Sequence, residues 1–447
     1  SDVCSSDLEH GNWGMMARPV LAAYRAHVER VNGDTSFYAR RTMPGEIEAI
    51  RARAAATFGV ESAEFAFTRN ATEAMRALIL GYNKLRPGDA VLYADLDYDS
   101  MQACMESLKV RRGVEVIRID LPLPATRQAV IHAYAQAFMR HPNLRMALLT
   151  QVSHRTGLVL PVAEIAAMAK LHGIDLLVDA AHGVGQIDYK LPDLEADFIG
   201  INLHKWIGAP LGVGAIVIRN GRLADIDVDP AEPHADPEDI RSRVHTGTVD
   251  YAAQLAVPAA LDFHEAIGAA AKQARLRALR DRWVKPMRAL SGIEILTPDD
   301  PGSYGAITAF RVKGQTSHAA NVALAKRLLD EHGIGRRRFV ISSPRVWTHV
   351  GATIGDALGG VTPILLPDGE RHKNLRAVER AFDALIRAGA DSVKLEGGQN
   401  RRDVVRAIID AEIPVMGHLG LTPQSVLAMG GMKVQAKKSD AAQRLID

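Results

Sequence analysis

The chain has 447 residues, of which 47% are hydrophobic and 24% charged, a composition typical of a globular protein with two or more domains. Its formal net charge of +2, with acidic and basic residues interspersed, argues against a nucleic-acid-binding surface, which needs a clustered basic face. The two cysteines, Cys4 and Cys104, show neither CxxC nor zinc spacing and are typical of a reducing compartment. No apolar run reaches the ~18 residues of a membrane helix, and the first residues lack the apolar core of a signal peptide. We therefore expect a cytoplasmic protein without a metal, nucleic-acid or membrane partner.

Short β-rich runs alternate with helical patterns from residue 89 onward. The runs predicted as strands cover residues 90–96, 114–121, 145–154, 174–182, 196–202 and 212–219. Helical patterns lie between several of them, and the one at 161–173 begins with Pro161 and closes on Gly173, as helices commonly do. This alternation predicts the α/β class, with a mostly parallel sheet and helices on both faces. Ligands of such sheets bind at the carboxyl ends of the strands, so the residues that follow each strand are candidate site residues.

The second half of the chain changes character twice. A helical pattern covers residues 251–290, and residues 305–333 indicate a smaller α+β domain that stops after its first strand and helix. After Gly335 the remaining residues have the pattern of two unrelated βα pieces.

Lys205 lies among glycines and apolar residues in the segment INLHKWIGAPLGVG, directly after a predicted strand. An amine in such surroundings is favoured in its neutral, nucleophilic form, which suits Schiff-base chemistry. The plain alternative is a lysine that reaches solvent beside a turn.

Three further features make Schiff-base chemistry more specific. Asp179 ends the apolar strand IDLLVD, where a carboxylate can keep a ring nitrogen protonated. Asn70 in TRNATEAM predicts a helix N-cap, and the free N–H groups of Ala71 and Thr72 behind it can bind a phosphate. Tyr98 offers a flat ring just past a strand. Taken singly, Asp179 could be a metal ligand or a strand-end cap, Asn70 the N-cap of an ordinary helix, and Tyr98 a surface tyrosine. Together with the lysine, the three features indicate a pyridoxal-phosphate site.

The segments VDAAHGVGQ, GINLHKWIGAPLGVG and HTGTVDYAAQ closely resemble the class V aminotransferase-fold group of pyridoxal-phosphate enzymes, within it the isopenicillin N epimerase-like branch. The likeness extends from residue 9 to about 335 and implies the PLP-dependent transferase fold type I. It also implies that Lys205 carries the internal aldimine and moves the α-proton of an amino-acid substrate. The other implied cofactor contacts are Asp179 at the pyridinium, Tyr98 stacked on the ring, His182 near the phenolic oxygen, and Ala71, Thr72, Asn202 and His204 at the phosphate.

The resemblance also implies a homodimer with a shared active site, because Thr248 would reach the phosphate of the neighbouring subunit. Asn12 and His154 are weaker candidates for substrate contacts. Cysteine desulfurases share this fold but need a late thiol, and no cysteine follows Cys104. Epimerase, carbon–sulfur lyase and transaminase all start with loss of the α-proton, and these three reactions stay open.

Beyond residue 335 the resemblance breaks. Residues 337–390 resemble the N-terminal nucleotide-binding part of 3-dehydroquinate synthase, in which Glu370 and Lys373 match an NAD-contacting pair. Residues 388–447 resemble ketopantoate hydroxymethyltransferase, in which Glu396 matches a metal-ligand position and Lys394 and His418 match substrate contacts. Both pieces are incomplete, and two strands cannot close an eight-stranded barrel, so we expect a frayed tail and assign it no activity.

A chimeric chain explains these joins best. The leader SDVCSSDL resembles translated vector or adaptor text, and the small domain stops before the arginine that clamps the substrate carboxylate in this family. We therefore expect impaired activity; a hydroxymethyl transferase represented only by its C-terminal fragment and a non-catalytic PLP-binding module are the alternatives. The expected divisions are a leader at 1–8, an N-terminal segment at 9–40, a PLP-binding domain at 41–250, a linking helix with a truncated small domain at 251–335, and the two fragments at 336–387 and 388–447.

Overall fold

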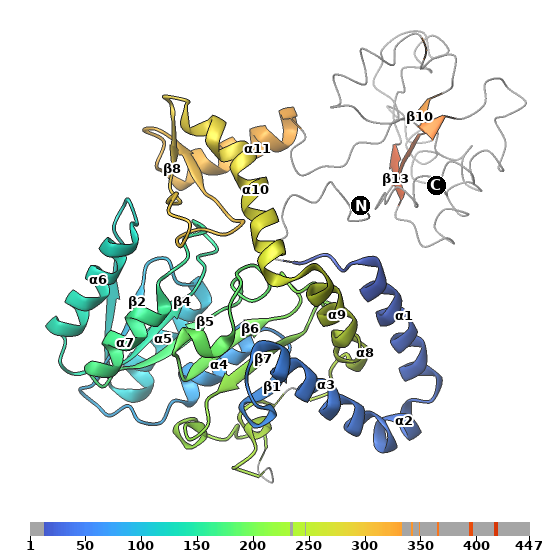
Figure 1. Ribbon diagram of the computed structural model, residues 1–447, viewed down its shortest axis with the longest axis horizontal. Coiled ribbons are helices and arrows are strands. Elements are labelled where there is room, and N and C mark those ends of the chain that lie inside the picture. Colours follow the sequence, from blue (N-terminus) through green and yellow to red (C-terminus); the bar gives the residue numbers. More distant parts are fainter. Residues whose placement is uncertain are drawn as a thin grey trace, which may run out of the picture. The chain divides into compact units, whose positions relative to one another are not determined.

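The structure is a computed structural model that describes residues 13–232, 236–245 and 247–332, together with the short segments 341–342, 348, 364–365, 393–396 and 415–418. The chain divides into two compact units, of which the first extends to Leu328 and the second begins at Leu329. The first unit contains the predicted sheet (Figure 1).

A seven-stranded sheet forms the centre of the first unit, in the order β1-β7-β6-β5-β4-β2-β3. Neighbouring strands are parallel, except that β7 is antiparallel to both β6 and β1. The strands are β1 (Phe65–Thr68), β2 (Ala90–Ala94), β3 (Glu115–Ile119), β4 (Leu144–Thr150), β5 (Asp175–Asp179), β6 (Phe198–Asn202) and β7 (Gly214–Ile218). The predicted α/β class and the mostly parallel sheet are therefore confirmed, and β1 is the strand that the sequence pattern did not predict.

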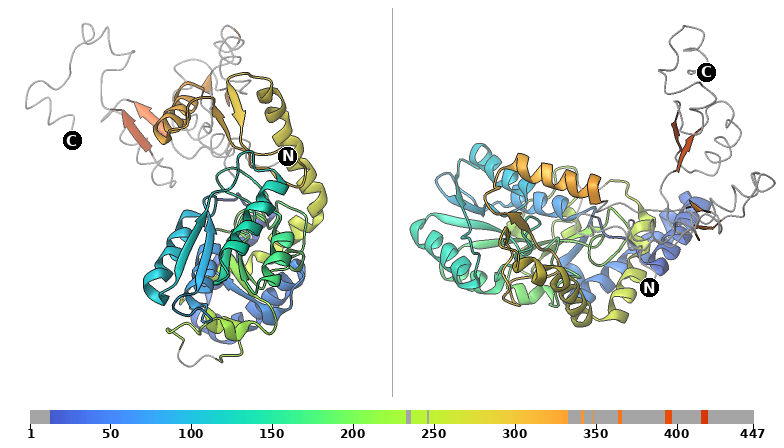
Figure 2. Two further views of the ribbon diagram at one scale, coloured as in Figure 1. Left: turned by 90° about the vertical axis from the view of Figure 1, so that its left-hand side faces the viewer. Right: turned by 90° about the horizontal axis from the view of Figure 1, so that it is seen from above.

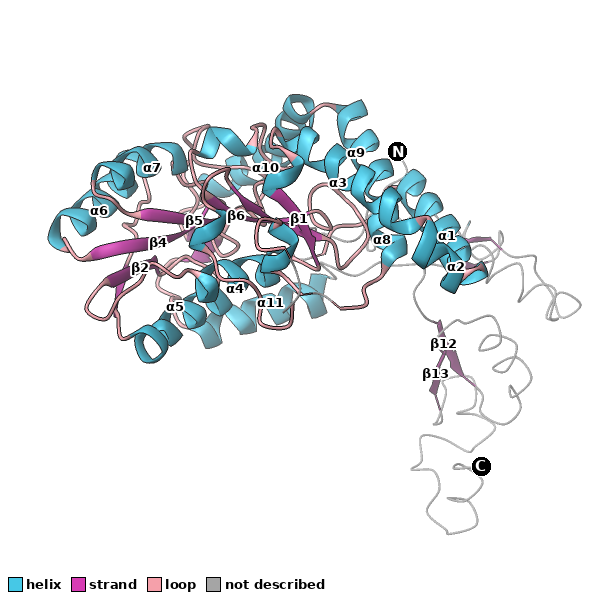
Figure 3. Cartoon of the chain, turned by 90° about the horizontal axis from the view of Figure 1, so that it is seen from below, coloured by secondary structure: helices cyan, strands magenta, loops and turns pink. Residues whose placement is uncertain are grey.

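Helices cover both faces of the sheet, which explains why the middle residues of its central strands are apolar on both sides (Figure 3). One face packs against α6 and α7 through side chains such as Ile165, and the other packs against α4 and α5 through side chains such as Met75. Full burial of a side chain of this size contributes about 1.5–3 kcal/mol, so the two helical layers hold the sheet in place. These helices are α4 (Ala71–Gly81), α5 (Asp99–Arg112), α6 (Arg127–Arg140) and α7 (Val162–Leu171).

Further helices precede and follow the sheet region in the described part of the chain. They are α1 (Arg18–Gly33), α2 (Thr35–Arg41), α3 (Met43–Phe58), α8 (Tyr251–Leu255), α9 (Val257–Ile267), α10 (Ala269–Arg288) and α11 (His318–His332). The single helical segment expected at 251–290 is wrong, because it divides into α8, α9 and α10. Pro258, in the first turn of α9, has no amide with which to continue α8, and Gly268 ends α9 with φ of 82°.

The helix α10, yellow in Figure 2, runs from the layers around the large sheet to a small antiparallel hairpin. This hairpin consists of β8 (Ile293–Ile295) and β9 (Phe310–Val312). The loop between its strands packs back on the large sheet region: the N–H of Val159 donates to the carbonyl of Ser303 at 3.0 Å. The start of the small domain is therefore attached directly to the loop that follows β4.

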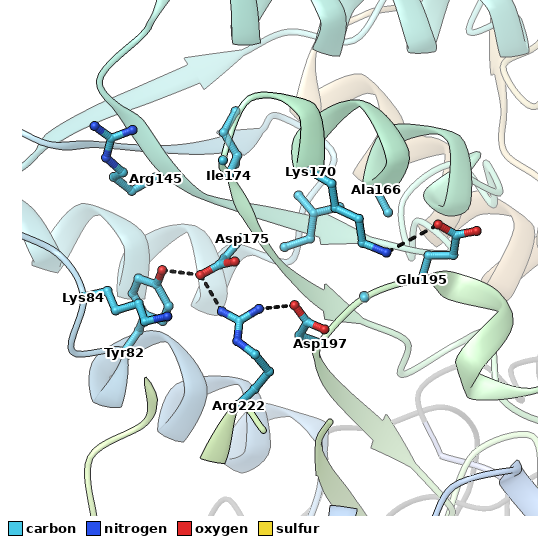
Figure 4. A pocket seen from close by; sticks show the side chains of 13 residues that line it. Tyr82, Lys84, Arg145, Ala166, Lys170, Ile174, Asp175, Glu195, Asp197 and Arg222 are labelled. Atoms are coloured by element: carbon cyan, nitrogen blue, oxygen red, sulfur yellow. Dashed lines mark hydrogen bonds and ion pairs between the residues drawn. The ribbon is translucent and has the colours of Figure 1, made fainter. Parts of the chain in front are cut away.

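Ionic bonds gather at the edge where the parallel strands begin (Figure 4). Arg222 donates to Asp175 and Asp225, each at 2.6 Å, and to Asp197. The hydroxyl of Tyr82 donates to Asp175 at 2.5 Å, and burial together with this bond raises the pKa of Tyr82. Apart from Asp225, these residues border a hollow of about 360 Å³. One guanidinium thus holds the residues that lead into β5 and β6.

The described residues of the second unit form two short parallel strand pairs. These are β10 (Ile341–Ser342) with β11 (Ile364–Leu365), and β12 (Val393–Glu396) with β13 (Val415–His418). In the second pair Glu396 is the register partner of His418, and Lys394 lies two residues earlier on the same strand. Across both units, none of the helices in the described ranges is long and apolar enough to span a membrane.

Candidate active site

A cavity of about 500 Å³ lies at the carboxyl ends of β4, β5 and β6, the edge at which ligands of parallel sheets bind. The N-terminal ends of α4 and α5 complete its wall. Lys205 and Asp179 therefore border the same cavity. Its lining residues are Trp13, Arg69, Asn70, Ala71, Thr72, Tyr98, Thr150, His154, Asp179, Ala181, His182, Asn202, His204, Lys205, Leu211 and Gly212.

The loop that carries Lys205 is held at three successive backbone carbonyls. The N–H of Gly14 donates to the carbonyl of His204 at 2.9 Å, and the N–H of Gly208 donates to that of Lys205 at 3.2 Å. The amine of Lys272 donates to the carbonyl of Trp206. Residue 14 must be a glycine, because a Cβ there would lie 1.9 Å from the carbonyl oxygen of Lys205. The N-terminal segment and α10 thus fix the backbone from which the amine extends.

The amine of Lys205 lies next to a buried histidine. Its Nζ is 3.0 Å from Nε2 of His182, and on the other side of the imidazole the indole Nε1 of Trp206 donates to Nδ1 at 3.4 Å. His182 is 5% exposed and Trp206 is 6% exposed. Burial, followed by the nearby charge of Lys205, lowers the pKa of His182 to about 3, so the ring is neutral at physiological pH.

Asp179 is the last residue of β5 and is buried. Its Oδ1 accepts the N–H of Ala181 at 3.0 Å, and its register neighbours are Thr150 on β4 and Gly200 on β6. Burial raises the pKa of Asp179, whereas the amide of Ala181 and the charge of Lys205 lower it. Since burial is the largest of these effects, a ligand with a cationic N–H would stabilise this carboxylate.

The helix α4 begins as the sequence predicts, but one of its amides is used differently. Oδ1 of Asn70 accepts the N–H of Glu73 at 2.8 Å, which confirms the N-cap. The prediction that the amide of Ala71 is free is wrong, because Oδ1 of Asn202 accepts it at 2.8 Å. Thr72 lines the cavity at the positive end of the helix dipole and is therefore the better-placed amide for an anion.

His204 has a defined proton position. Its Nδ1 lies 3.0 Å from the carbonyl of Val213, and because a carbonyl only accepts, Nδ1 carries the proton. The neutral ring then presents an acceptor at Nε2. Burial lowers the pKa of His204, although the bond to Val213 acts against this. A phosphate contact through His204 therefore requires a second proton on the ring.

Tyr98 and His154 form one aromatic wall of the cavity. Their ring centroids are 5.2 Å apart with planes at 87°, an edge-to-face pair. Nδ1 of His154 is buried and has no hydrogen-bond partner within the described residues. Burial, with the charges of Arg155 and Lys205, lowers the pKa of His154. A ligand group that donates or accepts a hydrogen bond, according to the tautomer of the ring, would satisfy this nitrogen.

Asp97 connects this wall to the sheet. Its Oδ2 accepts the N–H of Ala94 at the end of β2, and its Oδ1 accepts the N–H of Thr150 at the end of β4, both at 2.7 Å. Asp97 is 1% exposed, and burial raises its pKa to about 7 although both hydrogen bonds act in the opposite direction. Asp97 therefore holds two strand ends beside the cavity, and Tyr98 is the next residue.

The remaining predicted residues lie elsewhere. Thr248 is exposed and does not line the cavity of its own chain. Lys394, Glu396 and His418 belong to β12 and β13 of the second unit. Asn12, Glu370 and Lys373 lie outside the described residues.

Several lining residues were missed by the sequence analysis, among them Trp13, Arg69, Thr150 and Leu211. Thr150 could have been found, because it lies in the strand predicted at 145–154, and in the structure it ends β4 beside Asp179 on β5. Arg69 precedes the N-cap and forms a 2.5 Å ion pair with Glu73, which a helix pattern does not reveal.

The donor set of the cavity fits pyridoxal phosphate. An amine is available for an aldehyde, a buried carboxylate for a protonated ring nitrogen, and a helix N-terminus with Thr72 for a phosphate. The unpartnered Nδ1 of His154 gives a further polar contact for a ligand. Lys205, Asp179, Tyr98 and Thr72 are the residues that could hold such a group.

Comparison with known proteins shows which family the chain matches. Residues 15–338 match the family model described as aminotransferase class-V. Isopenicillin N epimerase of Streptomyces clavuligerus is 30% identical over 332 residues, which cover 70% of this chain and 82% of that protein. A solved structure of a lysine-to-alanine variant of C-DES, with glycine covalently linked to its PLP cofactor, superposes with a TM-score of 0.65. Its sequence identity is 22%, it covers 75% of this chain and 89% of its own, and the likeness concerns the fold.

A second family match covers the end of the chain. Residues 365–447 match the model described as ketopantoate hydroxymethyltransferase. The 3-methyl-2-oxobutanoate hydroxymethyltransferase 2 of Bradyrhizobium diazoefficiens is 63% identical over 68 residues, which are 15% of this chain and 23% of that protein. The expected likeness of residues 337–390 to 3-dehydroquinate synthase gains no support from the two models, because one ends at 338 and the other begins at 365.

The first match spans more than half of the chain and contains all the cavity residues from Arg69 to Gly212. The chain therefore belongs to the class-V aminotransferase family of PLP-dependent enzymes, and it carries in addition a fragment related to ketopantoate hydroxymethyltransferase.

Proposed function

We propose that the chain binds pyridoxal phosphate in this cavity and acts on an amino acid by moving its α-proton. The observation that carries the proposal is the presence of Lys205, Asp179, Tyr98 and Thr72 around one cavity. When bound, the cofactor supplies an aldehyde that condenses with amines and a pyridinium ring that withdraws electrons from the carbon being deprotonated.

The residues of the chain divide the remaining tasks. Lys205 binds the cofactor and moves the proton at the α-carbon, because its amine is held beside a neutral imidazole. Asp179 keeps a proton on the ring nitrogen, and its buried position strengthens this ion pair. Tyr98 packs against the ring, and Thr72 with the N-terminus of α4 binds the phosphate.

Epimerisation is the first reaction to test, because the relative with 30% identity over 332 residues is an isopenicillin N epimerase. Carbon–sulfur lyase and transaminase chemistry start from the same proton removal and are the alternatives. The fold likeness to C-DES supports the cofactor site without selecting among the three.

Two further expectations belong to this proposal. Thr248 is exposed and outside the cavity of its own chain, which is compatible with a homodimer in which it contacts the partner's phosphate site. The activity is impaired, since the family match ends at 338 and a ketopantoate hydroxymethyltransferase-like fragment follows it. That fragment corresponds to 23% of its relative, and a one-carbon transferase activity is therefore the second candidate only.

The proposal is tested with the full chain and added pyridoxal phosphate. Wild-type protein should develop the visible absorbance of a lysine-bound cofactor, and Lys205→Ala should not. Lys109→Ala, at an exposed position on α5, is the matched control and should behave as wild type. A wild type that stays colourless, or a Lys205→Ala protein with the same spectrum, refutes the proposal.

The reaction is then identified with a panel of L-amino acids in D₂O. Deuterium at the α-carbon establishes proton transfer. Inversion of configuration then indicates an epimerase, release of sulfide and ammonia together with a keto acid indicates a lyase, and a keto acid without sulfide or ammonia indicates a transaminase. Removing residues 388–447 should leave these signals unchanged, and no hydroxymethyl transfer to a keto acid is expected from the full chain.

A further inference from the structure

Lys205 and His182 line the cavity, and together with the indole of Trp206 they form a short hydrogen-bonded row. Nζ of Lys205 lies 3.0 Å from Nε2 of His182, and Nε1 of Trp206 donates to Nδ1 of the same ring at 3.4 Å. Both ring nitrogens of His182 are thus engaged, and the proton position on one decides the role of the other.

The indole fixes that proton position. An indole N–H only donates, so Nδ1 of His182 must be the acceptor and cannot carry a proton. The same contact excludes the imidazolium form, which would carry a proton on Nδ1 as well. The single ring proton therefore lies on Nε2 and points along the contact to Lys205.

This tautomer decides which form of the lysine fits. An ammonium group has donors but no lone pair, so it would meet the Nε2–H of His182 donor to donor. A neutral amine can accept that hydrogen bond. We propose that Trp206 is a positioning residue that, by setting the tautomer of His182, favours the neutral amine of Lys205 before the cofactor arrives.

The orientation of Trp206 is itself determined by the fold. The side chain is 6% exposed, and the backbone carbonyl of the same residue accepts Nζ of Lys272 from α10. The next carbonyls toward the N-terminus are held by Gly208 and by Gly14. The indole thus has little freedom to turn away from His182.

Other charged and titratable groups also face the amine. Asp179 on β5 favours the ammonium form of Lys205, whereas a proton gained by His154 or His204 would disfavour it, since the charge of each interacts with that of Lys205. Arg69, which precedes the N-cap of α4, and Tyr98, the N-cap of α5, line the same cavity. All of these groups affect the pH at which the amine of Lys205 becomes reactive. The contribution of the indole must therefore be isolated by a double-mutant cycle.

The inference deepens the proposed function, and it is measured on protein without cofactor so that the two can fail separately. The full chain is freed of cofactor by dialysis against hydroxylamine and exposed at a series of pH values to isotope-labelled acetic anhydride. Only a neutral amine reacts: its nitrogen bonds to a carbonyl carbon, acetate leaves, and the nitrogen releases one proton to water. Mass spectrometry then compares acetylation of Lys205 with that of Lys109, which is exposed on α5.

In wild type, Lys205 should reach half-maximal reactivity at a lower pH than Lys109. Trp206→Phe keeps the ring but removes the indole N–H, and it should reduce acetylation of Lys205 about three- to tenfold below the midpoint, the usual effect of one hydrogen bond. Trp283→Phe is the matched control, because Trp283 lies on α10 against Phe310 and should leave the midpoint unchanged.

His182→Ala distinguishes a tautomer effect from a packing effect. If the indole acts through the imidazole, adding Trp206→Phe to the His182→Ala protein leaves the pH midpoint of Lys205 acetylation unchanged. An unchanged midpoint in Trp206→Phe with native circular dichroism, or an equal shift in the His182→Ala background, overturns the inference. If the indole effect is present but pyridoxal phosphate gives no visible absorbance, the proposed function fails while this inference stands.

Discussion

Asp97→Asn tests whether a buried carboxylate links two strand ends beside the cavity. The side chain accepts the amides of Ala94 and Thr150, both at 2.7 Å. An asparagine has one acceptor oxygen, so its NH₂ group faces one of these N–H groups and leaves a buried donor without a partner. Such a loss costs about 1–3 kcal/mol of unfolding free energy.

The unfolding free energy lost in Asp97→Asn should depend on pH. The folded-state pKa of Asp97 is raised from 3.8 to about 7, mainly by burial, so the neutral acid is favoured in the folded protein. Its contribution to stability is therefore fully present below 3.8 and is lost as the pH rises through about 7. Asparagine does not titrate, so the unfolding free energy of the variant lacks this pH dependence. The unfolding free energy lost in Asp97→Asn should therefore be about 2–3 kcal/mol larger at about pH 5 than at about pH 8.

Urea unfolding of the full chain at these two pH values, followed by tryptophan fluorescence, measures both quantities. Asp95→Asn is the control, since Asp95 accepts a single amide, that of Leu121, which the carboxamide oxygen can also accept. A deficit of Asp97→Asn that is equal at both pH values, or larger at the higher one, refutes the reasoning.

Three further changes give separate expectations. Gly14→Ala should speed hydrogen exchange in residues 13–20, measured by mass spectrometry, because its Cβ meets the carbonyl of the lysine loop at 1.9 Å; Gly33→Ala, with nothing within 4 Å, should not. Asn202→Ala should lower the unfolding free energy by about 1–3 kcal/mol, since the buried amide of Ala71 loses its acceptor, and Asn202→Asp should restore most of it. Burial lowers the pKa of Lys272 from 10.5 to about 8, so wild type should gain stability as the pH rises between these values. Lys272→Met should lack this gain. An equal slope of unfolding free energy against pH in both proteins would contradict the assignment of the gain to Lys272.

Much of the sheet could be predicted because its signals are local. The parallel strands are short runs dominated by apolar residues, and the N-cap at Asn70 depends on residues three positions apart. β1 escaped prediction because three apolar residues and a threonine before Arg69 carry no pattern that separates a strand from a loop. The antiparallel direction of β7 is set by pairing with β6 and β1, which a single run does not encode.

The candidate site was predictable as a set of residue types, but its connections were not. Strand ends point to Asp179 and to the loop of Lys205. The bond between Ala71 and Asn202 joins residues 131 positions apart and removes an amide that the helix pattern counts as free. The link between Trp206 and His182 likewise arises from packing, since nothing in the spacing of these residues orients an indole toward one imidazole nitrogen.

The cluster at the amino edge of the sheet has a consequence for engineering this chain. Arg222 is the shared counter-charge of Asp175, Asp197 and Asp225, whose side chains are 22%, 32% and 12% exposed. Without the guanidinium, Asp175 and Asp197 would lose their ion pair while Asp225 keeps its 2.9 Å ion pair with Lys84. The remaining repulsion between the carboxylates would favour their protonation, so the most stable pH of an Arg222→Leu protein would move toward acid. β5 separates this edge from the cavity by about 16 Å, its five residues at about 3.3 Å each. Acid tolerance could therefore be adjusted at one end of the strands without altering the polar groups at the other.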